Sequence, residues 1–345
     1  MFKSDFLKAG HTPTLLAAFL YFDLAFMVWV MLGPLGVQIA ADLNLTHTQK
    51  GLMVATPVLA GALLRLVMGV LVDHLKPKKA GAIGQIIVIV ALFVAWQHGI
   101  HSYEQALLLG LFLGVAGASF AAALPLASRW YPPQHQGTAM GIAGAGNSGT
   151  ALAALIAPSL AIAYGWSNVF GLALIPLILV FVLYLVMAKD APECPAPKSL
   201  TEYFTILKDK DAWWFMFFYS VTFGGFVGLA SSLTIYFNTQ YGLALAGFVA
   251  AMLCLGMGNG AVFQLVPQRF RKEIGVMTGL VGMAGGVGGF YLASSLGYSK
   301  QATGSYQAGF LIFAALAVFA LIGLTGVKNR WRTTWGASHL TAAKI

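Results

Sequence analysis

The chain alternates along its whole length between long apolar runs and short polar segments. A helix needs roughly 20 apolar residues to cross about 30 Å of hydrocarbon, and ten of the runs are long enough. The pattern therefore predicts an all-α membrane protein with about ten transmembrane helices. The expected spans are residues 14–40, 49–72, 79–98, 104–130, 135–163, 166–188, 212–238, 244–267, 273–296 and 305–327.

Composition agrees with lipid as the solvent of this fold. The 345 residues are 59% hydrophobic and 9% charged, and the mean hydropathy is +0.79. A soluble domain of this length would need far more charge to cover its surface. The net charge is +9, and the basic residues that produce it lie mostly in loops. No nucleic-acid-binding motif accompanies them, so no nucleic acid partner is expected.

No pattern in the chain is typical of an enzyme. We find no nucleophile–base set, phosphate-binding loop or cluster of metal ligands. Of the two cysteines, Cys194 lies in a polar loop and Cys254 in an apolar run, which argues against a disulfide and a metal site. We therefore expect neither enzymatic activity nor a cofactor.

The basic residues predict the orientation. With the N-terminus inside, 17 of the 20 Lys and Arg residues fall in inner segments, Lys50 and Lys300 fall outside, and Arg65 lies within a span. Cytoplasmic loops carry the excess of Lys and Arg. We expect a multi-pass protein of the cytoplasmic membrane with both termini cytoplasmic.

An internal repeat divides the chain into two unequal halves. Residues 114–125 and 256–267 share a glycine-rich pattern that ends in Pro, and each is followed by a basic turn and a glycine-rich helix. Duplicated halves are typical of transporters. We expect a pseudo-symmetric bundle whose parts are a six-helix half at 1–188, a cytoplasmic linker at 189–211, and a four-helix half with a basic tail at 212–345.

The repeat also indicates that two helices are missing from the second half. From the start of the first span to Gly114 the chain runs 100 residues, whereas from the start of the seventh span to Gly256 it runs 44. The shortfall of 56 residues equals two helices with their loops. The expected junction lies near Tyr241–Gly247.

Arg65 lies near the middle of the second span, where a charge costs several kcal/mol. An acid, a cavity or an anionic ligand must offset that cost. Guanidinium suits a planar oxyanion, because its donor fork matches two oxygens at once. The alternative is a structural ion pair without a ligand.

Asp23 is the only acid well inside a span. It could neutralise Arg65, take up a proton in a coupling step, or be satisfied by neighbouring hydroxyls.

Four uncharged side chains are further candidates for lining a site. Asn147 and Asn259 could contact substrate or bridge helices. Phe120 and Phe263 hold equivalent places in the repeat and could sandwich a flat anion, although aromatic rings on membrane helices more often serve packing.

Glycines at small-xxx-small spacing predict close helix contacts in the fifth and ninth spans. The loop between the second and third spans carries Gly69 and Asp73, which we interpret as a gating or structural element. The signature glycines are Gly141, Gly144, Gly146, Gly149, Gly279, Gly282, Gly285 and Gly286.

These motifs resemble those of a known family. The loop from Gly69 to Lys79 partly resembles the loop motif of the major facilitator superfamily. The segments that begin at Gly141 and Gly279 are similar to the two signatures of its nitrate/nitrite porter family, in the assimilatory bacterial branch. The resemblance implies alternating-access transport of nitrate, with nitrite exchange or export as a further activity. It also implies substrate contacts at Arg65, Phe120 and Asn147.

The chain departs from that family in one respect that concerns the site. The family has twelve helices and a second substrate arginine on helix eight, whereas here the next Arg after Arg129 is Arg269, in a cytoplasmic turn. Two alternatives therefore stay open. One is a degenerate or non-transporting membrane protein of the same descent, and the other is a transporter of a different small anion.

Overall fold

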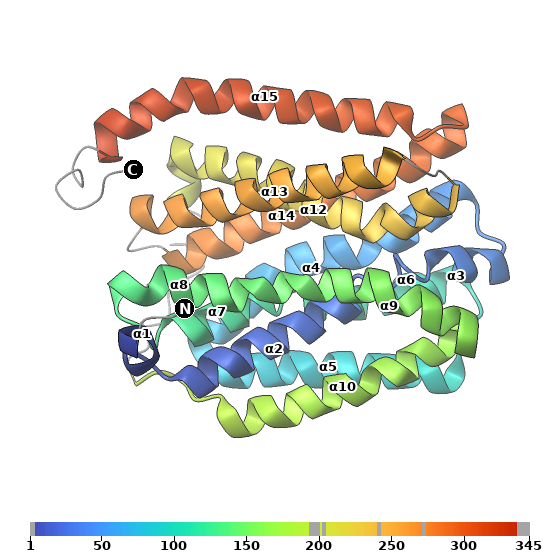
Figure 1. Cartoon of the computed structure of the whole chain (residues 1–345), viewed down its shortest axis with the longest axis horizontal. Helices are drawn as coiled ribbons and strands as arrows, with labels where there is room; N and C mark the ends of the chain where they lie inside the picture. The colour runs from blue at the N-terminus through green and yellow to red at the C-terminus, as the bar shows by residue number, and fades with distance from the viewer. Residues whose placement is uncertain (1–3, 193–200, 202–204, 240–242, 271–273, 337–345) are drawn as a thin grey trace.

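The computed structural model describes residues 4–192, 201, 205–239, 243–270 and 274–336. Within these ranges every regular element is helical (Figure 1). The elements are α1 (Ser4–Lys8), α2 (Thr12–Trp29), α3 (Gly36–Asp42), α4 (His47–Leu75), α5 (Pro77–His98), α6 (Tyr103–Gly117), α7 (Phe120–Ser128), α8 (Pro133–Gly144), η1 (Ala145–Ser148), α9 (Gly149–Tyr164), α10 (Trp166–Met187), η2 (Ile206–Lys208), α12 (Lys210–Thr239), α13 (Leu243–Arg269), α14 (Ile274–Thr303), α15 (Gln307–Trp331) and a final π-helical turn, η3 (Arg332–Gly336).

The predicted all-α membrane fold is confirmed. In the described part of the chain, nine helical segments are long and apolar enough to cross a membrane. The tenth predicted span coincides with α13, whose shorter apolar segment is Ala250–Val266. Helices α12 and α13 are separated only by residues 240–242, which lie outside the described residues, as does part of the predicted junction.

Three predicted spans are interrupted rather than continuous. Residues 14–40 become α2 and α3 with a turn between them that contains Gly33 and Pro34. The fourth span breaks between α6 and α7, and the fifth passes through the 3₁₀ turn η1 at its glycine-rich signature. Hydropathy predicts where a chain crosses lipid, but glycine, proline and tight packing decide where the helix breaks.

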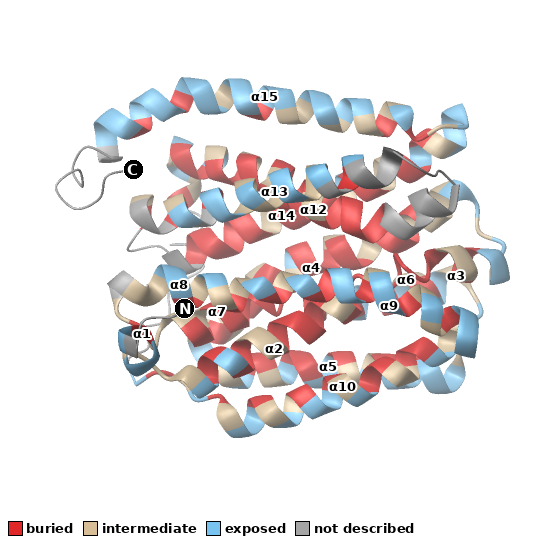
Figure 2. Cartoon of the chain, viewed as in Figure 1, coloured by how far each residue is buried: buried red, intermediate tan, exposed pale blue. Residues whose placement is uncertain are grey.

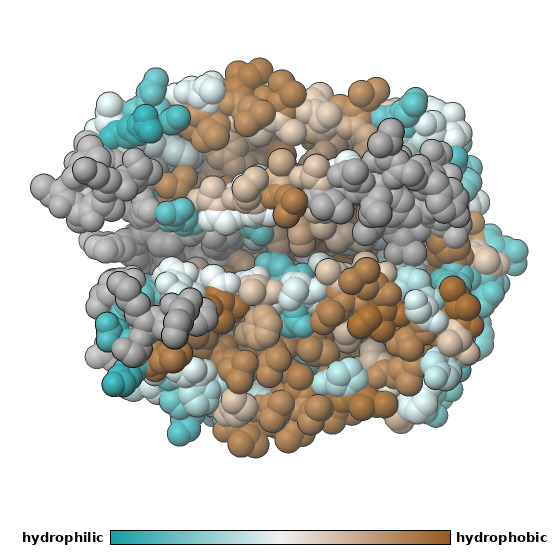
Figure 3. Space-filling model, viewed as in Figure 1, coloured by the Kyte–Doolittle hydropathy of each residue, from teal (hydrophilic) through white to brown (hydrophobic). Residues whose placement is uncertain are grey.

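The helices lie in two groups that meet along α4 and α14. In Figure 1, α2 to α10 form the lower group and α12 to α15 the upper group. Buried residues concentrate between the helices, whereas α15 exposes most of its length (Figure 2). Brown apolar side chains cover much of the visible outer surface in Figure 3, as a lipid-facing surface requires. The division at 189–211 stays a prediction, because much of that segment lies outside the described residues.

Helices α4 and α14 contact each other backbone to backbone. A Cβ added at Gly297 would lie 2.8 Å from the Cα of Gly51, and one added at Gly286 would lie 2.5 Å from the Cβ of Ala62. Such an approach needs residues without bulk, as at small-xxx-small interfaces. The glycines of α14 are therefore part of the contact that joins the two groups of helices.

This contact loosens toward the end of the bundle that carries the termini. At Gly279 the nearest atom to an added Cβ is a methyl carbon of Leu66 at 3.8 Å, and at Gly69 no atom lies within 4 Å. At the opposite end, a Cβ on Gly33 would lie 2.1 Å from the carbonyl oxygen of Ser231. The described residues of the two groups are thus packed more tightly at the end of the bundle away from the termini (the closed end) than at the terminal end.

Ion pairs at the terminal end tie helix ends together within each group. Asp73, near the end of α4, lies 3.5 Å from the guanidinium of Arg129, which follows α7. Asp211, in the first turn of α12, accepts hydrogen bonds from Arg269 at 3.1 Å, from Trp331 at 2.8 Å and from Arg330. Asp73 and Asp211 therefore each hold the ends of neighbouring helices together.

The signature glycines offer a matched test of packing. A Cβ at Gly149 would lie 1.8 Å from the carbonyl oxygen of Asp23, whereas one at Gly141 would meet no atom within 4 Å. We expect Gly149→Ala to lower the apparent melting temperature of the detergent-solubilised protein, since overpacking costs about 1–3 kcal/mol. Gly141→Ala should leave that temperature unchanged or raise it, because Ala favours helix by roughly 1 kcal/mol. Equal effects of the two substitutions would contradict this packing.

Candidate anion-binding site

Arg65 is fully buried where both groups of helices meet, with an exposed fraction of 0%. Its Nε donates a hydrogen bond to the carbonyl oxygen of Gly117, on α6, at 3.2 Å. Its Nη1 donates one to the carbonyl oxygen of Gly282, on α14, at 2.5 Å. The guanidinium therefore bridges the two groups through backbone carbonyls.

Three aromatic rings surround the guanidinium. Its central carbon lies 4.8 Å from the ring centroid of Phe223, 5.1 Å from that of Phe120 and 5.5 Å from that of Trp29. The electron-rich face of an aromatic ring attracts a cation, and more strongly when water is excluded. Trp29 is held in place by a hydrogen bond from its Nε1 to the carbonyl oxygen of Pro57 at 2.7 Å. The rings stabilise the charge and keep the site dry.

One nitrogen of Arg65 has no partner. Among the described residues, no hydrogen-bond acceptor reaches Nη2, and no carboxylate forms an ion pair with Arg65. A buried charge without a counter-ion is costly unless another group compensates it. The geometry leaves the two N–H groups of Nη2 available to an anion.

Asp23 does not neutralise Arg65. Its carboxylate accepts a hydrogen bond from the hydroxyl of Ser148 at 2.6 Å, and its backbone packs against Gly149. The residue is 6% exposed. Of the roles considered from the sequence, this arrangement fits an acid satisfied by a hydroxyl, and it leaves proton uptake as a proposal.

Asn147 lies in the turn η1. Its Nδ2 donates to the carbonyl oxygen of Gly144 at 2.7 Å, while its buried Oδ1 finds no partner among the described residues. The preceding turn residue, Gly146, packs against Phe22, whose ring lies 5.8 Å from that of Phe120. Asn147 therefore lies near these aromatic rings. Its side-chain hydrogen bond goes to Gly144 and not to Arg65.

Of the two candidates on α13, only Asn259 has a described side chain, and no hydrogen bond joins it to Arg65. Asn259 is half-buried on a helix that packs against α12, where a Cβ on Gly258 would lie 2.6 Å from Thr222. Phe263 lies on the same helix, and its side chain falls outside the described residues. The sandwich of Phe120 and Phe263 therefore stays a prediction, and the ring that faces Arg65 from the second group of helices is Phe223.

The signature glycines divide into two sets. A Cβ added at Gly282 would lie 3.2 Å from Cδ of Arg65 and 3.6 Å from the ring of Phe120. At Gly285 it would lie 2.5 Å from the ring of Tyr219. No atom approaches within 4 Å at Gly141 or Gly144, so the close packing expected from their spacing is not seen there.

Sequence reasoning missed Trp29, Phe223 and Tyr219 as neighbours of this site. The chain contains 24 Phe, 12 Tyr and 8 Trp, so aromatic identity alone could not single these three out. The spacing of Tyr219 and Phe223, four residues apart, places both rings on one face of α12. That spacing predicts a shared face but not what the face contacts.

The fold and the buried cation define a polytopic carrier built from two groups of helices. Residues 15–327 match the family model of the Major Facilitator Superfamily, and the chain belongs to that superfamily. The chain also resembles the crystal structure of a bacterial homologue of the human lysosomal transporter Spinster, solved in an inward-facing and unoccupied conformation. The TM-score is 0.50 at 16% sequence identity, over 94% of this chain and 81% of that one.

Within the superfamily, the chain belongs to the nitrate/nitrite porter family. It is 30% identical to the nitrite extrusion protein of Bacillus subtilis, over 89% of this chain and 93% of that protein. It is 30% identical to the probable nitrate/nitrite transporter NarK2 of Mycobacterium tuberculosis, over 86% and 91%. The same identity holds for the probable nitrate transporter NarT of Staphylococcus carnosus, over 89% and 94%. These relatives confirm the predicted family.

The alignments also bear on the missing helices. The comparison with the Bacillus subtilis protein extends over 369 positions, which exceeds the 345 residues of this chain. Positions of the relative therefore lack a counterpart here. This agrees with the shortfall that the internal repeat indicates.

Stability measurements can separate a functional Arg65 from a structural one. We expect Arg65→Met to leave the apparent melting temperature unchanged or raise it, because a hydrophobic replacement of a buried charge is neutral or stabilising by about 1–4 kcal/mol. Asp211→Ala should lower the temperature, since it leaves Arg330 without its carboxylate and removes one of the two carboxylates that pair with Arg269. A loss for Arg65→Met as large as that for Asp211→Ala would make Arg65 a structural residue.

Proposed function

We propose that the chain is a secondary transporter of nitrate, with nitrite as a second substrate, and that Arg65 is its anion anchor. One observation carries the proposal: a fully buried guanidinium with no carboxylate partner and one nitrogen unpartnered among the described residues. The printed names of the relatives, nitrite extrusion protein and nitrate transporter, support the choice of anion.

The chemistry of the site favours a small planar monovalent anion. Nη2 can donate to one oxygen of the ligand, and Nη1 can donate to a second oxygen once it leaves the carbonyl of Gly282. Hydrogen bonds to charged groups are about twice as strong as neutral ones. Aromatic rings exclude water, which strengthens the electrostatic attraction. A single cation balances one negative charge, so a divalent oxyanion would remain uncompensated. Phe120 and Asn147 are proposed as lining residues of this site.

Alternating access supplies the transport step. We assign 1–188 and 212–345 as the two moving halves and 189–211 as their linker. Arg65 donates to Gly117 in the first half and to Gly282 in the second. Opening the closed end separates α4 from α14 and breaks the bond to Gly282. A bound anion then takes over the donor that this carbonyl releases.

The proposed orientation places both termini in the cytoplasm. Along the sequence, 17 of the 20 basic residues fall in the segments expected on that side, which supports this orientation by the positive-inside rule. The closed end is then the outer end, in the cytoplasmic membrane of a bacterium. The loosened contact beyond Arg65 faces inward.

The missing helix pair changes what the second half can contribute. In place of a second arginine, the described part of that half brings a carbonyl from α14 and the ring of Phe223 to Arg65. The net positive charge of the site is thus one rather than two. We propose that such a site releases nitrate more readily and still transports it.

Substitution of the anchor tests the function directly. Arg65→Lys keeps the charge but removes the planar fork. We expect labelled nitrate uptake into proteoliposomes to fall roughly tenfold or more, because charge-assisted hydrogen bonds contribute about 1.5–3 kcal/mol each. Arg332→Lys, at an exposed position, should transport as the wild type does. Equal uptake by Arg65→Lys would refute the anchor, and nitrate binding without flux in the wild type would favour a non-transporting protein.

Substitution of Asp23 tests whether this residue carries a coupled proton. If Asp23 takes up the coupled proton, Asp23→Asn abolishes nitrate uptake driven by a pH gradient and leaves nitrate–nitrite exchange between preloaded vesicles intact. A neutral amide can still accept the hydrogen bond from Ser148, so the fold is preserved. Gradient-driven uptake that survives the substitution excludes Asp23 as the proton carrier.

A further inference from the structure

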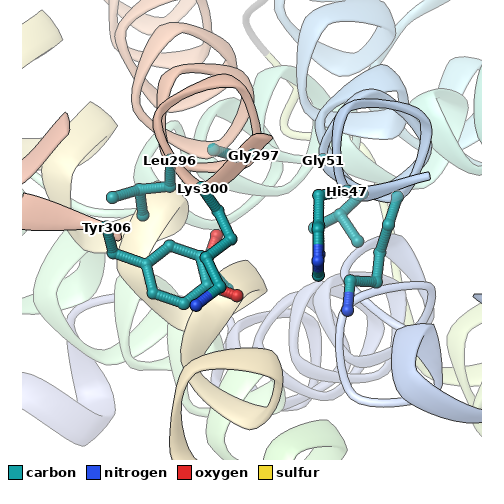
Figure 4. A pocket seen from close by; sticks show the side chains of 10 residues that line it. His47, Gly51, Leu296, Gly297, Lys300 and Tyr306 are labelled. Carbon is teal, nitrogen blue, oxygen red and sulfur yellow. The ribbon is translucent and has the colours of Figure 1, made fainter. Parts of the chain in front are cut away.

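The two lysines on the outer side of the bundle line one cavity. Lys50 is on α4, in the first half, and Lys300 is on α14, in the second half. A small cavity lies between these helices, and its walls include His47, Ser232 and Tyr306. Figure 4 shows His47 facing Lys300 and Tyr306 across it. Cationic groups from both halves therefore share one small space.

No carboxylate balances these charges within the described residues. None of the ion pairs found there involves Lys50 or Lys300. The Nζ of Lys300 donates to the carbonyl oxygen of Gly304 at 2.7 Å and lies 5.4 Å from the ring centroid of Tyr306. Lys50 also stands in the first turn of α4, the end at which the helix dipole is positive. Lys50 and Lys300 carry like charges, which repel each other. A small anion between them would attract both lysines.

The floor of the cavity is a close backbone contact between the halves. Gly51 and Gly297 line the cavity, and their backbones touch, since a Cβ on Gly51 would lie 2.9 Å from the Cα of Gly297. Lys50 and Lys300 can line the same cavity only while the backbones of Gly51 and Gly297 are in contact. Any ligand that holds both lysines must therefore favour the closed outer end.

We propose that this cavity is a second site for a small monovalent anion such as nitrate, separate from Arg65, and that an anion bound there stabilises the closed outer end. The identity of the anion and the outward orientation rest on the proposed function. The cavity size restricts the ligand to a few heavy atoms. Opening of the outer end moves Lys50 away from Lys300 and dismantles the site.

Protection from chemical modification tests the site without requiring transport. The purified full chain in detergent is treated with a limiting amine-acylating reagent in sodium nitrate or in sodium gluconate at equal ionic strength. Mass spectrometry then gives the acylation rate of each lysine. We expect nitrate to slow acylation of Lys50 and Lys300 several-fold relative to gluconate, which is too large for the cavity. Lys79, an exposed lysine at the other end, should react equally in both salts.

Two variants make the result decisive. In Lys50→Gln, nitrate should no longer protect Lys300, whereas Lys79→Gln should leave that protection intact. In Arg65→Lys, protection of both outer lysines should persist, because the sites are separate. Absence of protection in the wild type, equal protection of Lys79, or loss of protection in Arg65→Lys would each overturn the proposal.

The same measurements keep this proposal distinct from the transport function. Protection without nitrate flux in proteoliposomes would leave the outer site standing and remove the proposed function. Flux that depends on Arg65, combined with unprotected outer lysines, would leave the function standing and remove the outer site.

Discussion

A single guanidinium, buried without a counter-ion, is the constraint on which the rest of this structure depends. Arg65 is held by one carbonyl from each half and by three aromatic rings, and none of these carries a full negative charge. Carbonyl dipoles and ring faces hold the cation in place, yet they leave its charge unbalanced. The proposed role of Arg65 as an anion anchor follows from this unbalanced charge.

The glycines of α14 explain how such a site can sit between two halves that must separate. Gly286 and Gly297 let α14 touch α4 through backbone atoms, so the closed end is formed without interlocking side chains. Gly282 brings a carbonyl and Arg65 together in the same way. Backbone-to-backbone contacts of this kind are easily made and unmade, since no rotamer has to change.

Much of this fold followed from the sequence, and the limits of that reasoning are physical. Apolar length predicts membrane crossings, and the high cost of a charge in lipid singles out Arg65 from the sequence. The breaks within spans were missed, because hydropathy does not register a turn such as η1. Phe223 was missed because contact between α12 and Arg65 depends on tertiary packing, and the alternative pairing of Asp23 with Arg65 failed because Ser148 lies closer.

Asp211 has a mechanical consequence for the group of helices α12 to α15. A bundle with fewer members has fewer lateral neighbours to keep each rod aligned, and α15 in particular is almost bare along its length. One carboxylate at the start of α12 fastens the ends of α13 and α15 at a common hinge point. The ends of α12, α13 and α15 are thereby tied to one another, so a displacement of one of these helix ends carries the other two with it.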